Sequence, residues 1–430
     1  MDVIDRLRQR DARVAVVGQG YVGLVVAMRA SEADFDVVGF EIDARRAALL
    51  ASGDSYIEDI DDGVLGAALE RGYLPTADPG DLAGFDVAVI SVPTPLDDGL
   101  PDLSFVESAS RLLAEHLRPD TLVILESTTY PGTTEELVRP LLEAGSGLRA
   151  GTDFLLGYSP ERIDPGNPQF SLHNTPKVVA GIDESSLAAV ETFFGAFVDK
   201  VVPVSGTGEA ELTKVIENTF RHVNIALVNE IAMFAYDLGI DAMEAIDAAA
   251  TKPFGFMRFT PGPGVGGHCL PIDPSYLSWR VKQHLGENFR FIELANDINA
   301  HMPHYVVRRL QAMLNRDRKA VNGSRILVLG LAYKPDVGDA REAPSLPIVE
   351  QLRSLGAEIV TVDPFVDATV VNGDLALQRE LTADVLDGAD AAVLVTDHAE
   401  FDLDLLVRSG VPVLDTRGAI APGHDHVERL

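Results

Sequence analysis

The sequence is poor in cysteine, in lysine and in long apolar runs, and each shortage excludes a class of protein. A single cysteine, Cys269, among 430 residues cannot form an internal disulfide, which is typical of a reducing compartment. No apolar run approaches the ~20 residues that span a bilayer, and residues 1–6 lack the apolar core of a signal peptide. We therefore expect a cytoplasmic protein without a membrane segment, and we expect no bound metal.

Basic residues are scarce as well. Lysine and arginine total 35 against 66 aspartates and glutamates, a formal net charge of -31, and only seven of the 35 are lysine. Nucleic acids and anionic membranes require basic surface, so we expect neither as a partner. Such an acidic excess strains a fold by self-repulsion, which salt screens. We infer a high-salt cytoplasm; a melting temperature that falls from dilute buffer to molar KCl would contradict this inference.

Near its start the chain has the pattern of a dinucleotide-binding strand–turn–helix unit. Residues 13–17 predict a buried parallel strand, and Gly18-Gln19-Gly20-Tyr21-Val22-Gly23 follows at once. Residues 24–30 then predict a helix, and residues 35–40 predict a second strand. The alternative is an ordinary tight turn in a Rossmann-like domain that binds no cofactor.

Within this unit each glycine has a separate role. Gly18 permits the tight turn, Gly20 lets the backbone meet a pyrophosphate, and Gly23 lets helix and strand pack closely. Glu41 lies 21 residues after Gly20, where an acid bonds the adenosine ribose and repels a 2′-phosphate. We therefore expect NAD rather than NADP, although the neighbouring Arg45 is basic.

Two later strands, 87–92 and 122–126, end in loops rich in proline and hydroxyl groups. The first loop contains Pro93 and Thr94, and the second contains Thr128. Ligands of open α/β sheets bind beyond the carboxyl ends of strands, so these loops suit ribose and nicotinamide. Ordinary turn chemistry is the alternative.

The middle of the chain lacks proline and glycine from residue 209 to 235 and has helical apolar spacing, which predicts one long helix. Lys214 and Asn218 are four residues apart and project from one face of it. A solvated pair on an exposed face is the alternative. Long central helices often build subunit interfaces, so we expect a homodimer.

A second α/β pattern begins near residue 325, with strands at 325–331 and 358–362 around a helix at 344–355. Lys334 and Arg341 follow its first strand and suit an anionic ligand, unless they form surface ion pairs. The sequence thus predicts an α/β protein in which two Rossmann-like doubly wound domains are joined by a central helical domain with a long helix. We place these domains at 1–205, 206–315 and 316–430.

The loop around Cys269 reads Gly264-Val265-Gly266-Gly267-His268-Cys269-Leu270-Pro271-Ile272-Asp273-Pro274. A lone cysteine is usually a small buried hydrophobe. Glycines that allow close approach, a carboxylate four residues later and a cofactor motif in the same chain favour a nucleophile instead.

These segments resemble the nucleotide-sugar 6-dehydrogenases, the family of the UDP-glucose, UDP-N-acetylglucosamine, UDP-N-acetylmannosamine and GDP-mannose dehydrogenases, from Gly18 to about Arg417. The resemblance implies an N-terminal NAD domain, a helical dimerising middle and a C-terminal domain that helps to bind the nucleotide of the sugar. Besides the glycine motif and the cysteine loop, it is carried by Glu126-Ser127-Thr128-Thr129-Tyr130-Pro131-Gly132-Thr133, Tyr158-Ser159-Pro160-Glu161-Arg162, Glu211-Leu212-Thr213-Lys214 and Gly330-Leu331-Ala332-Tyr333-Lys334-Pro335-Asp336.

The resemblance also implies roles for matching residues. The catalytic set is Cys269 as nucleophile, Lys214 and Asn218 for developing oxyanions, Asp273 and Thr128 for a water, and Glu161 as acid/base in thioester hydrolysis. The cofactor set is Gly18, Gly20, Tyr21, Val22, Gly23, Glu41, Arg45, Pro93, Thr94, Thr128 and Arg341. The substrate set is Glu161, Arg162, Lys214, Asn218, Arg258, Gly264, Gly266, Gly267, Lys334 and Arg417.

The chain departs from the UDP-glucose enzymes at His268, where they typically have serine, and in the loop after Glu161. Both departures are typical of the branch that acts on N-acetylated sugars, and residues 251–257 most resemble the UDP-N-acetylglucosamine enzymes. We therefore expect four-electron oxidation of the C6 hydroxyl of UDP-N-acetylglucosamine by NAD, through a cysteine thiohemiacetal and thioester, for polysaccharide or glycan precursors. UDP-N-acetylmannosamine and UDP-glucose are alternative substrates. A two-electron hydroxyacid dehydrogenase and a non-catalytic nucleotide-sugar-binding protein are alternative functions.

Overall fold

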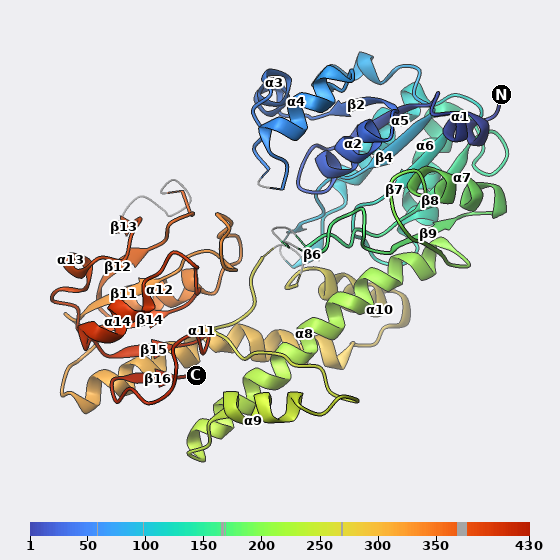
Figure 1. The fold of residues 1–430 in the computed structure, drawn as a ribbon. Coiled ribbons are helices and arrows are strands. Elements are labelled where there is room, and N and C mark those ends of the chain that lie inside the picture. Colours follow the sequence, from blue (N-terminus) through green and yellow to red (C-terminus); the bar gives the residue numbers. More distant parts are fainter. Residues whose placement is uncertain (58, 98, 165–166, 168, 268–269, 368–375) are drawn as a thin grey trace. The chain divides into compact units, whose positions relative to one another are not determined.

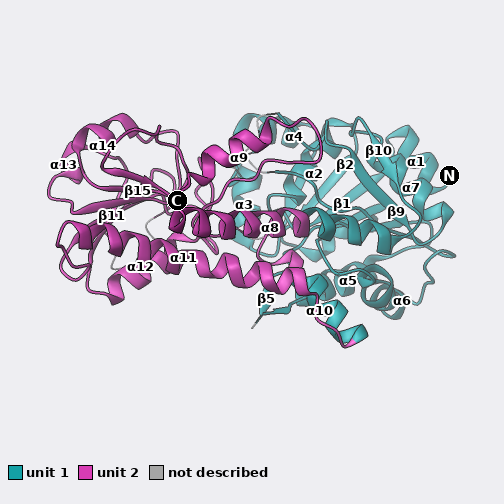
Figure 2. Cartoon of the chain, turned by 90° about the horizontal axis from the view of Figure 1, so that it is seen from below, with its two compact units in different colours: residues 1–217, 275–285 teal, residues 218–274, 286–430 magenta. Residues whose placement is uncertain are grey.

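The chain forms two compact units in the computed structural model (Figure 2). The first comprises residues 1–217 and 275–285, and the second comprises residues 218–274 and 286–430. The structure describes residues 1–57, 59–97, 99–164, 167, 169–267, 270–367 and 376–430. The three-part division with boundaries at 205 and 315 remains a prediction.

The first unit is built on an eight-stranded sheet with the order β10-β9-β8-β7-β4-β1-β2-β3 (Figure 1). All neighbours in it are parallel except β8 and β9, which are antiparallel. The strands are β1 (Arg13–Val17), β2 (Asp36–Phe40), β3 (Leu74–Thr76), β4 (Val87–Ile90), β7 (Leu122–Leu125), β8 (Leu155–Tyr158), β9 (Lys177–Gly181) and β10 (Val201–Pro203). A small hairpin adds β5 (Leu96–Asp97) and β6 (Leu100–Pro101).

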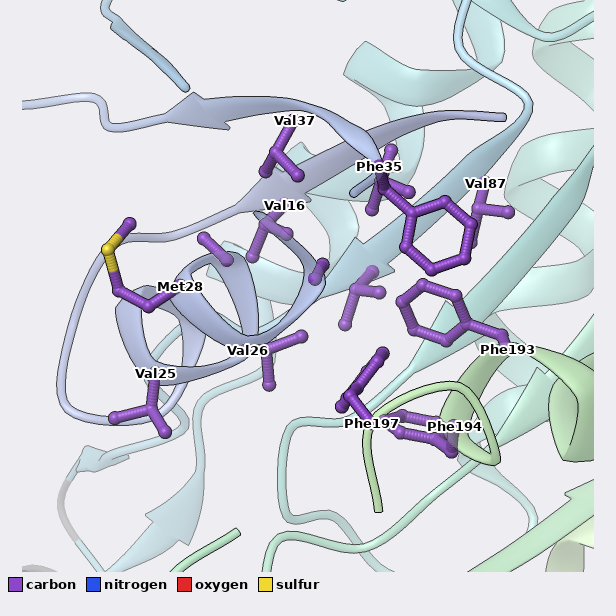
Figure 3. Close-up of a cluster of buried hydrophobic side chains, with 14 of the residues drawn as sticks. Val16, Val25, Val26, Met28, Phe35, Val37, Val87, Phe193, Phe194 and Phe197 are labelled. Carbon is purple, nitrogen blue, oxygen red and sulfur yellow. The ribbon is translucent and has the colours of Figure 1, made fainter. Parts of the chain in front are cut away.

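Helices cover this sheet because its central strands are apolar on both faces. Figure 3 shows Phe35, Phe193 and Phe197 packed near Val16 and Val26 in one of the resulting cores. The unit's helical segments are α1 (Val3–Gln9), α2 (Gly23–Glu32), α3 (Ala44–Ser52), α4 (Asp62–Glu70), η1 (Pro79–Leu82), α5 (Ser104–His116), η2 (Thr134–Val138), α6 (Arg139–Ser146), α7 (Glu184–Phe194), the start of α8 (Thr207–Asp237) and most of α10 (Asp273–Leu285).

The second unit contains a fully parallel six-stranded sheet with the order β13-β12-β11-β14-β15-β16. Its strands are β11 (Arg325–Leu329), β12 (Glu358–Val362), β13 (Ala376–Gln378), β14 (Ala391–Leu394), β15 (Val413–Asp415) and β16 (Val427–Arg429). Its helices are the rest of α8, α9 (Ala242–Ala250), α11 (Arg290–Arg316), α12 (Ser345–Ser354), α13 (Ala383–Leu386) and α14 (Leu403–Ser409).

The central strand of this second sheet, β11, contributes side chains to two separate cores. Ile326 and Val328 belong to one cluster of buried side chains, and Leu327 and Leu329 belong to another. Alternate side chains of a strand point to opposite faces, so both faces of the sheet are covered. The predicted class, with two parallel-sheet domains and a central helical region, is confirmed.

The predicted long helix is α8, a single helix of 31 residues. A second long helix, α11, has 27 residues and was not predicted, since Pro303 lies inside it. Within the described residues, no helix has both the length and the apolar character needed to cross a bilayer.

A buried aspartate closes the carboxyl end of the second sheet. Asp363, which follows β12, accepts hydrogen bonds from the backbone amides of Leu331 (2.6 Å) and Ala332 (3.0 Å) and lies 3.0 Å from Nε2 of His398. Burial by itself raises the pKa of Asp363, but the bonds from His398 and from backbone amides outweigh burial and lower it to about 2. The loop after β11 is therefore held by a charge on the neighbouring strand.

Candidate active site

Protein packing requires two of the three glycines in the motif after β1, and the third faces open space. Gly18 has φ +93°, and a Cβ there would lie 2.3 Å from the Ser91 carbonyl oxygen. A Cβ on Gly23 would lie 1.9 Å from the Gly18 oxygen, but one on Gly20 would meet nothing within 4 Å. Val22, the N-cap residue of α2, makes no side-chain capping bond. This cradle fits a pyrophosphate at the positive end of the helix.

Glu41 lies directly beside this cradle, at the end of β2, and is buried. Its Oε2 accepts a hydrogen bond from the Gln19 amide at 3.2 Å, and its Oε1 accepts one from the Asp43 amide at 3.0 Å. A carboxylate has about four acceptor positions, so two remain for ribose hydroxyls. The Arg45 side chain is 90% exposed and pairs with Asp43 at 3.1 Å, and its cofactor contact remains a prediction.

The two loops predicted to face the cofactor are bonded to each other. Oγ of Ser127 accepts from the Val92 amide at 2.9 Å and donates to the Val92 carbonyl at 2.8 Å. Thr94 is buried, and its carbonyl accepts from the Tyr276 hydroxyl at 2.9 Å. Pro93 is exposed and Thr128 is half-buried. The loops meet because β4 and β7 are neighbouring strands.

Glu161 belongs to a buried charge cluster that the sequence analysis missed. Nζ of Lys177 forms an ion pair with Oε1 of Glu126 and lies 3.8 Å from Oε2 of Glu161. Oε1 of Glu161 accepts from the Ile163 amide. The only sequence signal was a lysine at the start of an otherwise apolar strand.

Asn218 and Asp273 are 55 residues apart in sequence and directly bonded in the structure. The Asn218 amide donates to Oδ2 of Asp273 at 2.5 Å, and both side chains are buried. Lys214, one turn earlier in α8, is also buried. Cys269 and His268 lie outside the described residues, so the role of the cysteine stays a prediction.

The glycines before the cysteine pack tightly against the loop after β11. A Cβ on Gly266 would lie 2.8 Å from the Glu342 carbonyl oxygen, and the Gly267 amide donates to the Arg341 carbonyl at 3.1 Å. Gly264 would bring a Cβ 3.3 Å from the Asn299 carbonyl. Backbone packing therefore explains these glycines, and their contact with substrate remains a prediction.

Two arginines assigned to the substrate have protein partners. Arg162 donates to Glu217 at 2.7 Å and to the Pro176 carbonyl at 2.6 Å. Arg258 donates to Asp247 at 2.7 Å and is exposed. Their contacts with substrate remain predictions.

Three further basic residues follow strands of the second sheet. Arg341 forms a two-contact ion pair with Asp339, with distances of 2.9 and 2.6 Å. Arg417 donates to the Val395 carbonyl at 2.6 Å, and burial lowers the pKa of its guanidinium. Lys334 is half-buried. Their contacts with cofactor or substrate stay predictions. In the part of the chain that the structure describes, no cluster of three or more His, Cys, Asp or Glu could hold a metal ion.

Three family models match the chain in succession. The NAD binding domain of the UDP-glucose/GDP-mannose dehydrogenase family matches residues 12–198, the central domain of that family matches residues 208–301, and its UDP binding domain matches residues 327–422.

Curated relatives and solved structures agree with these matches. The chain is 39% identical over 391 residues to a UDP-N-acetyl-D-mannosamine dehydrogenase of Pyrococcus horikoshii, covering 90% of each chain. It is 38% identical over 396 residues to a UDP-N-acetyl-D-glucosamine 6-dehydrogenase of Pseudomonas aeruginosa, covering 91% of this chain and 92% of the relative. A solved UDP-N-acetyl-D-mannosamine dehydrogenase from Pyrococcus horikoshii superposes with a TM-score of 0.88 and 36% identity, covering 97% of this chain and 98% of the other.

The open space at Gly20 leads to a binding prediction. We expect Gly20→Ala to keep the melting temperature of the parent, because its Cβ meets no protein atom within 4 Å. The same Cβ would occupy the approach to the pyrophosphate, so we expect NAD affinity to fall about tenfold or more. Calorimetric titration with NAD and thermal melting measure the two effects. Gly66→Ala, also open but within α4, is the matched control; an unchanged NAD affinity in Gly20→Ala would contradict the assignment.

Proposed function

This chain belongs to the UDP-glucose/GDP-mannose dehydrogenase family, and from that premise we propose that its substrate is a UDP-N-acetylhexosamine. The chain is an NAD-dependent nucleotide-sugar 6-dehydrogenase. The observation that carries the proposal is that an NAD binding model and a UDP binding model match one chain, and that its relatives of 39% and 38% identity are dehydrogenases of UDP-N-acetyl-D-mannosamine and UDP-N-acetyl-D-glucosamine.

Two epimers are candidates for the sugar. UDP-N-acetylglucosamine is the first, because residues 251–257 and the residues around Asp273 resemble the enzymes that oxidise it. UDP-N-acetylmannosamine is the second, and it is favoured by a relative of 39% identity and a structural match with a TM-score of 0.88. Both sugars present the same C6 hydroxyl, so they differ in recognition and not in chemistry.

The chemistry converts a primary alcohol and one water into a carboxylate with the loss of four electrons. NAD supplies the hydride acceptor, and two equivalents are reduced for each sugar. We assign to Cys269 the role of nucleophile: its sulfur bonds C6 and so keeps the aldehyde on the enzyme. Such a covalent intermediate divides one difficult oxidation into easier steps. Attack on the aldehyde puts negative charge on its oxygen, for which an ammonium at Lys214 and an amide at Asn218 are suitable partners.

The buried hydrogen bond between Asn218 and Asp273 supports this division of roles. Because Oδ2 of Asp273 accepts one amide proton, the orientation of the Asn218 amide is set before substrate arrives. The second amide proton is then available to an oxyanion. Glu161 acts as acid/base in the hydrolysis of the thioester.

NADH formation tests the proposal. We expect two NADH per sugar with UDP-N-acetylglucosamine or UDP-N-acetylmannosamine, and much slower turnover with UDP-glucose or GDP-mannose. The measurement is absorbance of NADH against sugar consumed, at low and at molar KCl. One NADH per sugar would indicate a two-electron dehydrogenase, and no NADH with any of the four would indicate a binding protein.

A cysteine variant is the control for the covalent route. Cys269→Ser should abolish steady NADH production while NAD affinity survives, because serine is a much weaker nucleophile at neutral pH. Undiminished steady turnover in this variant would contradict the covalent intermediate without affecting the assignment of substrate.

We propose that the enzyme is a homodimer joined through α8. Phe220, Leu227, Ile231 and Phe234 are between 44% and 61% exposed. Their spacing of seven, four and three residues places them on one side of the helix, where a second copy would cover them. Light scattering should give twice the chain mass, and Phe234→Asp should lower it; a monomeric parent would contradict the proposal.

A further inference from the structure

Lys177 is the centre of a buried charge cluster in the first unit. It is the first residue of β9, and its side chain is 1% exposed. Its Nζ pairs with Oε1 of Glu126, donates to the Pro160 carbonyl at 3.1 Å and lies 3.8 Å from Oε2 of Glu161. The same atom lies 4.9 Å from the centre of the Phe194 ring. Glu126, Glu161 and Lys177 thus come from three successive strands or strand ends of the sheet.

The cluster holds more acceptors than donors. Oε1 of Glu126 is bonded by Lys177, and Oε1 of Glu161 is bonded by the Ile163 amide. Oε2 of Glu126 and Oε2 of Glu161 are buried and accept no hydrogen bond from any residue that the structure describes. A buried acceptor without a donor destabilises the folded protein, and more so when it is charged. One added proton would turn one of these oxygens into a donor for the other.

The charges favour that proton at neutral pH. Two ionised carboxylates against one ammonium would leave a net negative charge in a buried site. The pKa of Glu126 is raised to about 7: burial is the largest cause, the ammonium of Lys177 opposes it, and the negative charge of Glu161 adds to it. Lys177 and Glu161 are the charged groups that act on Glu126 from the strands packed against it.

We propose that Glu126 and Glu161 share one proton beside the ammonium of Lys177, so that Glu126 is a positioning residue that sets the protonation state of Glu161. This inference rests on the proposed function, in which Glu161 is the acid/base of thioester hydrolysis. The transfer breaks an O–H bond on one carboxyl group as it forms one on the other, and Lys177 keeps its charge throughout. During hydrolysis Glu161 takes a proton from the attacking water and delivers one to the departing sulfur. The shared proton makes both protonation states accessible near neutral pH.

If the ion pair of Glu126 and Lys177 is purely structural, we expect a different result when the charge of Glu126 is removed. If Glu126 only balances Lys177, its amide variant changes stability and leaves the pH dependence of hydrolysis alone. If Glu126 shares a proton with Glu161, the amide leaves Lys177 paired with Glu161 alone. An adjacent ammonium favours the ionised carboxylate, so the protonated form of Glu161 becomes rare at neutral pH.

The test is Glu126→Gln, measured by rapid mixing with NAD and sugar across a range of pH. We expect a burst of NADH followed by steady turnover slowed about tenfold or more, because a Glu161 carboxylate stabilised by Lys177 alone is a weaker base for the attacking water, while the hydride transfers proceed. The KM values and the NAD affinity should change little. The change in kcat that occurs near pH 7 in the parent should occur at a lower pH in this variant.

Glu211→Gln is the matched control. Burial raises the pKa of Glu211 to about 7 as well, but its carboxylate bonds the amides of Gly132 and Thr134. We expect this variant to keep the limb near pH 7 where it is in the parent. Glu126→Asp retains an ionisable group and should keep a limb within about one pH unit of the parent.

The outcomes separate the two proposals. A folded Glu126→Gln with the parent's pH profile and turnover overturns the shared proton and leaves the dehydrogenase assignment intact. A parent enzyme that makes no NADH overturns the function instead. If Glu126→Gln does not fold, the Glu211→Gln variant decides, because its residue 211 carries no carboxyl group: infrared difference spectra of that variant should show a protonated carboxylic acid that disappears as the pH rises through about 7. Its absence at pH 6 overturns the proposal.

Discussion

The backbone groups at the carboxyl ends of the parallel strands in the first unit need hydrogen-bond partners. This constraint determines where the unit buries charged side chains. The ladder of backbone bonds continues for one residue beyond each strand: the Gly18 amide donates to Phe40, and the Glu126 amide donates to Ile90. Side chains that begin there stand at the border between an apolar core and the binding edge of the sheet. Glu41 and Glu126 occupy such positions, Glu161 lies three residues beyond the end of β8, and all three are buried. The glycine cradle and the proton-sharing cluster are therefore two results of one topology.

Burial alone does not decide the charge of these acids. Asp363 and Glu126 are both fully enclosed, yet the pKa of Asp363 is lowered to about 2 and that of Glu126 is raised to about 7. Asp363 receives backbone amides and the ring of His398, which stabilise the ionised form without adding charge. Glu126 receives one ammonium that it shares with a second carboxylate. The number of donors for each oxygen separates a structural anion from a group that holds a proton near neutral pH.

The sequence was sufficient to predict the strands and helices that depend on a local residue pattern. The strand at 13–17 was predicted with the bounds it has, and the long helix predicted over 209–235 extends from Thr207 to Asp237. The pairing of Asn218 with Asp273 and that of Lys177 with Glu126 were beyond it, because they join residues 55 and 51 apart through the order of strands and helices. The helix α11 was missed because Pro303 usually ends a helix.

Lysine at position 177 limits the number of hydrogen-bond donors in the cluster. An ammonium carries three N–H groups, and two of them serve Oε1 of Glu126 and the Pro160 carbonyl. The third is left to the space between Oε2 of Glu161 and the Phe194 ring. In this arrangement no N–H of Lys177 is left for Oε2 of Glu126. An arginine has five N–H groups in a planar fork, enough for one on each of the four carboxylate oxygens. The compact ammonium leaves one buried oxygen without a donor, and a proton shared between the two acids would supply it.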